Sequence, residues 1–453
     1  MRGLLVFASA FAVVSPARAA APPAWPAQIA REARSTRAAW DRLAYLCDHF
    51  GARLSGTRRL EDAIAWIAGA MRGDGLEVRL EKVRVPRWVR GAESAELTQP
   101  VAQPISMMGL GGSVGTPEDG ITGEVFVVRS FDELDARKRE AQDRIVLFNA
   151  PFTDYGDTVR YRWEGASRAA RAGARACLVR SIALSSLRSP HTGSMGYDEK
   201  VVRIPAAAVS IEDAQMLQRM QDRGERIVLK LRMEAKTLED TDSYNVVAEW
   251  RGRELPKEVV VLGGHIDSWD VGPGAHDDGA GVIASWEALR LISRIARRPR
   301  RTVRVVLWTN EENGGRGADA YRDAHRAELP LHVAAIESDS GAFHPRGFRF
   351  SGSKEALVQV RRLAVALAPL EADEIFEGAH GTDISRLTAE GVPGLDLDVD
   401  GGDYFRYHHS AADTPDKVRP EDLADCAAAL ATMSYALADD EKPLPRAQRE
   451  KAK

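Results

Sequence analysis

Hydrophobic and polar positions follow two different periodicities along this chain. Apolar residues recur every three to four positions from about Ile29 to Gly75, which predicts helices, and a strand-like run follows at residues 76–80. From Thr241 onward, continuous apolar runs predict strands at residues 259–262, 303–307 and 332–336, and residues 279–295 have helical spacing. Strands that are apolar on both faces and alternate with helices are typical of an α/β fold with a covered parallel sheet.

The middle of the chain has a different character. Short β-like runs at residues 123–128, 144–148 and 176–179 are separated by glycine-rich turns, and one helical stretch covers residues 166–172. Because the helix and strand pattern resumes afterwards, we predict a small β-rich unit inserted into a larger domain. The predicted organisation is a peptide leader at residues 1–21, a discontinuous domain of residues 22–98 and 237–440, an insert of residues 99–236, and a polar tail of residues 441–453.

The leader has the features of a secretory signal peptide. Arg2 is followed by an apolar stretch from Leu4 to Val14 and by small residues, which predicts cleavage near Ala19 or Ala21 and a secreted or periplasmic protein. The stretch is short for a bilayer span, although an uncleaved anchor stays open as an alternative. No later segment has the sequence of a transmembrane span.

Charge and cysteine content narrow the function further. The 62 basic and 66 acidic residues give a net charge of -4, which argues against a nucleic-acid-binding platform. Only three cysteines are present, Cys47, Cys177 and Cys426, and their odd number and scattered positions indicate buried free thiols rather than a disulfide framework.

Acidic and histidine residues follow each predicted strand of the larger domain. They are His265, Asp267, Asp277 and Asp278 after the first strand, Glu311 and Glu312 after the second, Asp339 after the third, and His408 and His409 much later. Loops at the carboxyl ends of parallel strands open on one edge of the sheet. Clustered carboxylates are costly unless cations neutralise them, and mixed histidine and carboxylate groups suit Zn²⁺. Each element alone is commonplace in loops, but together they predict a metal site with one carboxylate shared between two ions.

The motifs GGHIDSWDVGPGAHDDGAG, NEEN, ESDSG, GTD and YFRYHHSAADT resemble those of the co-catalytic di-zinc aminopeptidase family. Within that family the chain looks most like the plasma glutamate carboxypeptidase branch, whose members carry an inserted protease-associated domain. The resemblance implies a zinc exopeptidase fold, with a mixed, largely parallel central sheet flanked by helices. It also identifies residues 99–236 with the protease-associated insert.

The resemblance also implies a role for each site residue. The implied ligands of two Zn²⁺ ions are His265, Asp277, Glu312, Asp339 and His409. Asp277 would bridge the ions, Glu311 would be the general base, and Asp267 would orient His265. The family often has a cis peptide between the paired aspartates. The implied substrate contacts are His408, Asp383 and Tyr407, and His409 rather than His408 fits the family spacing.

The implied activity is hydrolysis of short peptides or dipeptides by a water held between the two ions. A homodimer is an open alternative to a monomer. A single-zinc glutaminyl cyclase and a non-catalytic receptor-like member of the fold are the rival interpretations, and the full ligand set argues against both. We interpret His276 as lying beside the site. The remaining histidines lack a comparable setting and are interpreted as lying outside it: His49, His191, His325, His332, His344 and His380.

Overall fold

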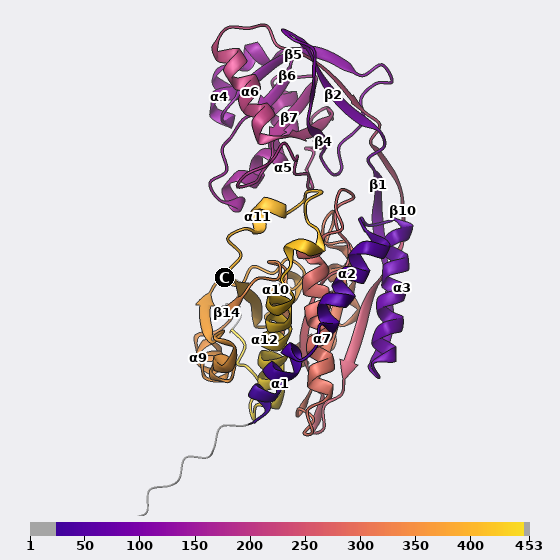
Figure 1. Cartoon of the computed structure of the whole chain (residues 1–453), viewed down its shortest axis with the longest axis vertical. Coiled ribbons are helices and arrows are strands. Elements are labelled where there is room, and N and C mark those ends of the chain that lie inside the picture. The colour runs from indigo at the N-terminus through magenta and orange to yellow at the C-terminus, as the bar shows by residue number, and fades with distance from the viewer. Residues whose placement is uncertain (1–23, 448–453) are drawn as a thin grey trace, which may run out of the picture.

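The computed structural model describes residues 24–447 as two units, each built on an eight-stranded sheet (Figure 1). The predicted signal peptide lies outside the described residues, as does the end of the predicted tail. The first sheet has the order β1-β10-β12-β11-β13-β16-β14-β15. Its strands are β1 (Glu77–Val89), β10 (Lys236–Trp250), β11 (Leu255–His265), β12 (Arg301–Trp308), β13 (His332–Glu337), β14 (Pro345–Ser351), β15 (Glu374–Glu377) and β16 (Gly394–Val399).

The centre of this sheet is parallel. Strands β12, β11, β13 and β16 are parallel to one another, whereas β10 pairs antiparallel with β12, and β14 pairs antiparallel with β16. The predicted α/β fold with a mixed, largely parallel sheet is therefore confirmed. Each strand predicted in this part of the chain is present, and the predicted helix at residues 279–295 corresponds to α7 (Ala280–Ser293).

Helices cover both faces of the sheet, which explains the continuous apolar strands. Val260 and Leu262 belong to the larger core cluster, while Val259 and Val261 belong to a separate cluster on the opposite face. Helices on the first face are α1 (Trp25–Arg34), α2 (Ala38–Phe50), α3 (Arg58–Gly73), α7, α9 (Lys354–Ala364) and α12 (Pro420–Asp439). Helices on the second face are α8 (Arg316–Ala324) and α10 (Ser385–Ala389).

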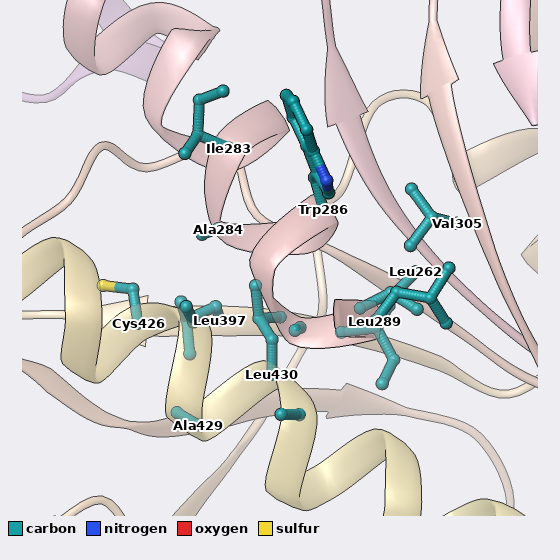
Figure 2. Packing of buried hydrophobic residues seen from close by; sticks show 14 of the residues in the cluster. Leu262, Ile283, Ala284, Trp286, Leu289, Val305, Leu397, Cys426, Ala429 and Leu430 are labelled. Atoms are coloured by element: carbon teal, nitrogen blue, oxygen red, sulfur yellow. The ribbon is translucent and has the colours of Figure 1, made fainter. Parts of the chain in front are cut away.

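Helices α7 and α12 pack against each other and against the sheet (Figure 2). Leu289 of α7 is fully buried, and alanines on α12 such as Ala429 allow the two helices to approach closely. Cys426 lies in the same core, and all three cysteines are buried and free, as predicted. In the described part of the chain, no helix combines the length and the apolar character needed to cross a bilayer.

The second unit lies beyond the long strands β1 and β10, through which the chain enters and leaves it (Figure 1). Its sheet has the order β3-β2-β9-β5-β6-β7-β8-β4, with β5 to β8 parallel. The strands are β2 (Glu93–Gln99), β3 (Gln103–Ile105), β4 (Met107–Gly109), β5 (Ile121–Val128), β6 (Ile145–Phe148), β7 (Ala176–Arg180), β8 (Ala206–Val209) and β9 (Val228–Met233). Three helices accompany them: α4 (Phe131–Ala136), α5 (Tyr155–Arg171) and α6 (Ile211–Asp222). We refer to residues 93–233 as the inserted unit.

Candidate metal centre

The carboxyl ends of three parallel strands deliver the acidic and histidine residues to one edge of the first sheet. Strand β11 ends at His265, β12 leads into a turn that contains Glu311 and Glu312, and β13 ends two residues before Asp339. The glutamate pair thus lies in a turn beyond the strand, so its two side chains are free of the alternation that a strand would impose. The last contribution comes from His408 and His409, which follow the short helix α11 (Tyr404–Tyr407).

Asp277 lies between two histidines. Its Oδ1 atom is 3.2 Å from Nε2 of His265, and its Oδ2 atom is 3.2 Å from Nε2 of His409. Asp339 Oδ1 lies 3.5 Å from the same nitrogen of His265, and Glu312 Oε2 lies 3.0 Å from that of His409. The five side chains therefore form two groups that share Asp277.

The donor atoms fit zinc in type and spacing. A nitrogen and an oxygen ligand bonded tetrahedrally to one ion at about 2.0–2.2 Å lie about 3.3–3.6 Å apart, and the nitrogen–oxygen distances in each group run from 3.0 to 3.5 Å. Among the described residues, three buried atoms of the cluster make no hydrogen bond: His265 Nε2, Asp277 Oδ2 and Asp339 Oδ1. His265 Nδ1 donates to the Asp267 carbonyl at 2.9 Å, so the lone pair of Nε2 faces the carboxylates.

Without metal, the cluster shifts the pKa values of its own members strongly. Burial would lower the pKa of His265, but the charge of Asp339 and the contact with Asp277 raise it well above its usual value. Burial raises the pKa of Glu311 to about 8, and burial together with the charge of Asp277 raises that of Glu312 to about 7. Such mutual perturbation is expected where several carboxylates share a buried site that a cation would otherwise neutralise.

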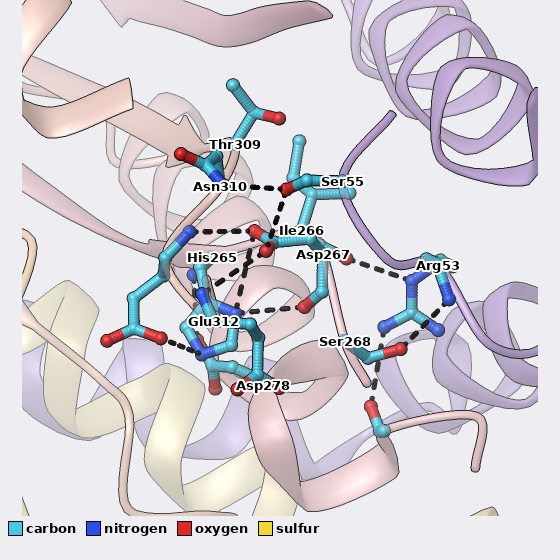
Figure 3. Close-up of polar contacts among 12 residues, drawn as sticks. Arg53, Ser55, His265, Ile266, Asp267, Ser268, Asp278, Thr309, Asn310 and Glu312 are labelled. Atoms are coloured by element: carbon cyan, nitrogen blue, oxygen red, sulfur yellow. Dashed lines mark hydrogen bonds and ion pairs between the residues drawn. The ribbon is translucent and has the colours of Figure 1, made fainter. Parts of the chain in front are cut away.

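Asp267 supports the turn that carries the two glutamates (Figure 3). Its carboxylate accepts hydrogen bonds from the main-chain N–H groups of Glu311 at 3.1 Å and Glu312 at 3.3 Å, and from the Ser55 hydroxyl at 3.2 Å. The resemblance implied that Asp267 orients His265. In the structure its main-chain carbonyl does so, while the carboxylate is 4.0 Å from His265 Nδ1.

Two further aspartates hold the backbone around the bridging residue. The Asp277-Asp278 peptide is cis. Asp278 accepts hydrogen bonds from the N–H groups of His265 and Gly281, both at 3.0 Å, and so joins the end of β11 to the first turn of α7. Asp413 accepts from the N–H groups of His276 at 2.7 Å and Asp277 at 3.0 Å. His276 itself lies beside the cluster, stacked on Phe343.

Three comparisons with known proteins agree on the family. The model of peptidase family M28 matches residues 245–434. Carboxypeptidase Q of Bos taurus is 47% identical over 408 residues, which are 90% of this chain and 86% of that protein. The solved structure of a peptidase M28 precursor from Shewanella amazonensis superposes with a TM-score of 0.90 at 35% identity, over 94% of this chain and 98% of that one. The chain belongs to peptidase family M28. The predicted enzyme class, a metallopeptidase, is thereby confirmed.

A zinc aminopeptidase from Bacillus subtilis shares the fold of this M28 peptidase, with a TM-score of 0.67 at 19% identity over 89% of this chain and 95% of that one. The zinc exopeptidase fold that the sequence motifs implied is therefore confirmed. The relatives are peptidases, and they do not favour the cyclase or receptor interpretations.

A cavity of about 1300 Å³ opens over the metal centre of the M28 peptidase. Its walls come from both units: Tyr155, Arg162 and Trp163 of the inserted unit face Glu311, Asp339 and His408 of the first unit. The volume exceeds the roughly 300–1,000 Å³ of an ordinary small-molecule pocket. The space is therefore sufficient for a short peptide.

The three implied substrate contacts lie in different settings. His408 lines the cavity, stacks on His409 with ring centroids 3.6 Å apart, and places Nε2 3.6 Å from Asp277 Oδ2. Asp383 is fully buried, and neither of its carboxylate oxygens has a hydrogen-bond partner among the described residues. Tyr407 stacks on His276, and it is not among the described residues that line the cavity.

The inserted unit contributes residues that the sequence did not suggest. His191 was interpreted as lying outside any site, yet its Nδ1 atom is 2.6 Å from the carbonyl oxygen of His408. Thr192 and Arg162 contact His409. More than two hundred residues separate these partners along the chain, and no local motif marks the contact.

Proposed function

We propose that this M28 peptidase is a zinc-dependent exopeptidase that hydrolyses short peptides or dipeptides with two Zn²⁺ ions per chain. The observation that supports it most directly is the pair of ligand groups that share Asp277. His265 and Asp339 would hold one ion and Glu312 and His409 the other, with one oxygen of Asp277 directed at each histidine. His408 also groups with Asp277 and His409, but it is the weaker candidate ligand, because its Nε2 atom lies 3.6 Å from Asp277 whereas that of His409 lies 3.2 Å from Asp277 and 3.0 Å from Glu312.

The two ions and Glu311 would have different roles in the hydrolysis. Bound zinc polarises the scissile carbonyl and lowers the pKa of water from about 15.7 towards roughly 7. Glu311 is the residue of this chain that moves the proton: its carboxylate takes a proton from the attacking water and passes it to the leaving amine nitrogen. Its Oε2 atom lies 3.9 Å from His265 Nε2, beside both ligand groups, and its side chain lines the cavity.

Three observations support the proposed substrate class and the proposed cellular location of the enzyme: the relatives, the cavity and the signal-like leader. The relatives named carboxypeptidase Q and leucine aminopeptidase act at chain ends, which supports exopeptidase activity here. The cavity between the two units sets an upper limit on substrate size and so favours short peptides. The signal-like residues 1–21 support export to the periplasm or the outside. The inserted unit acts as the protease-associated domain that forms one wall of the cavity.

The test combines Glu311→Gln with a library of dipeptides that have free or blocked ends. Loss of a general base lowers turnover by about 10²–10⁴-fold, so the variant should bind two zinc ions per chain and lose most of kcat. Glu377→Gln is the matched control, because Glu377 is exposed on the edge strand β15 and is not among the described residues that line the cavity. Chelation should abolish wild-type turnover and added Zn²⁺ should restore it. Near-normal turnover by Glu311→Gln, or fewer than two zinc ions in the wild type, would refute the proposal.

A further inference from the structure

The inserted unit reaches the metal centre through one short segment, residues 191–193. The Nδ1 atom of His191 donates to the carbonyl of His408 at 2.6 Å. The N–H group of Thr192 donates to the carbonyl of His409 at 3.0 Å. Both main-chain carbonyls of the histidine pair are thus held by the inserted unit.

The imidazole of His409 also lies on this segment. Its Nδ1 atom is 3.3 Å from the carbonyl oxygen of Thr192, and Arg162 Nη1 donates to the same oxygen at 3.2 Å. With its proton on Nδ1, His409 donates to Thr192 and leaves Nε2 free to face Glu312 and Asp277. A Cβ atom on Gly193 would lie 2.7 Å from His409 Nδ1, so only glycine allows the ring to approach the backbone this closely.

The histidine of the other ligand group is oriented differently. The acceptor for His265 Nδ1 is the carbonyl of Asp267, two residues along the same loop. Among the described residues, His409 Nδ1 contacts only groups of the inserted unit, and His409 adopts a φ of 58°, in the left-handed region. For a residue other than glycine this conformation is strained and persists only where the surroundings impose it. His191 and Thr192 provide those surroundings.

We propose that His191 and the main chain of Thr192 are positioning groups for His409, so that the inserted unit supports one of the two metal positions and leaves the other unaffected. The proposal rests on the two-ion function given above for the identity of the ligands. It predicts that damage to the contact weakens zinc binding at the Glu312 and His409 position alone. The inserted unit is then a working part of the metal centre as well as a wall of the cavity.

Two substitutions at residue 191 distinguish a loss of the hydrogen-bond donor from a change in side-chain volume. His191→Phe keeps a buried ring but removes the donor to the His408 carbonyl. His191→Asn keeps a donor at the place of Nδ1. Loss of a group that orients a metal ligand lowers metal affinity about 10–100-fold. In competition with a chelator, His191→Phe should bind the first zinc ion as the wild type does and the second 10–100-fold more weakly, while His191→Asn should resemble the wild type. His49→Phe is the matched control, because that histidine lies on α2 and stacks on Tyr45.

Ligand variants identify the weakened position. In an Asp339→Asn background, which impairs the His265 position, adding His191→Phe should remove the remaining tight zinc. In a Glu312→Gln background, the same addition should change nothing further. Wild-type affinity at both positions in His191→Phe would overturn the inference, and so would an equal loss at both. A wild type that binds a single zinc ion would refute the two-ion function separately; unchanged affinity for that ion in His191→Phe would then overturn the inference as well.

Discussion

Asp267→Asn probes the support of the Glu311-Glu312 turn without changing the size of the side chain. The buried carboxylate accepts three hydrogen bonds, two of them from the N–H groups of the glutamates. Figure 3 shows those from Ser55 and Glu312. An asparagine has one acceptor oxygen, and its NH₂ group would face a main-chain donor. Loss of one hydrogen bond to a charged group costs about 1.5–3 kcal/mol, which corresponds to roughly 10- to 150-fold in rate if the whole cost appears in the transition state.

We therefore expect kcat of Asp267→Asn on a dipeptide to fall about 10- to 150-fold at saturating zinc, with a much smaller change in KM, because the glutamate that moves the proton is displaced. Ser55→Ala is the control: it removes the hydroxyl that donates to Asp267 and accepts from Asn310, but it leaves both N–H contacts of the carboxylate, so kcat should fall less than about 10-fold. The assay is steady-state kinetics with zinc content measured on the same samples. Turnover within twofold of wild type, or equal losses in both variants, would show that the carboxylate does not position the turn.

Two further predictions concern stability. Burial raises the pKa of Glu311 to about 8 and that of Glu312 to about 7 in the metal-free protein, from 4.5. The folded state then holds protons that the unfolded chain has released, so this stabilisation is complete below pH 4.5 and is lost as the pH rises through 7 to 8. The melting temperature of the chelator-treated protein should fall between pH 5 and 9, and that of the zinc-loaded protein should fall less; a rise for the metal-free protein would contradict this. Leu289→Ala, which empties a fully buried site between α7 and its neighbours, should lower the free energy of unfolding by about 2–5 kcal/mol in urea titrations while kcat of the folded protein is kept, and a loss below about 1 kcal/mol would mean that the site collapses without cost.

The sequence predicted the parallel centre of the first sheet because those strands are apolar on both faces. The apolar run at residues 303–307 predicts a strand, and β12 spans Arg301–Trp308. Strand β10 was missed, because its first half, from Lys236 to Asp240, is exposed and polar and is held by main-chain pairing with β1. Strand β16 was missed because Asp396 and Asp398 interrupt its apolar pattern. Arg346 and Arg349 pair with Asp398, and main-chain N–H groups satisfy Asp396.

The site was predictable to the extent that it follows the strands. Parallel strands bring their carboxyl ends to one edge, so residues after β11, β12 and β13 had to converge. The contact between His191 and the His408 carbonyl could not be predicted in this way. It depends on how the two units dock, and neither periodicity nor spacing within one unit encodes that geometry.

The two units meet both at the cavity and at the candidate metal ligands. The inserted unit leaves the first sheet at its outer strands β1 and β10, yet it contacts the chain again at His408 and His409, across the cavity. Tyr155 and Arg162 lie on the same helix, α5: Tyr155 stacks on Phe405 at the cavity wall, and Arg162 bonds the carbonyl that orients His409. If the contact positions His409 as proposed, a movement that separated residues 191–193 from His408 and His409 would remove the acceptor of His409. On that proposal, metal binding would favour the closed arrangement, and the cavity of about 1300 Å³ would limit the size of the peptide.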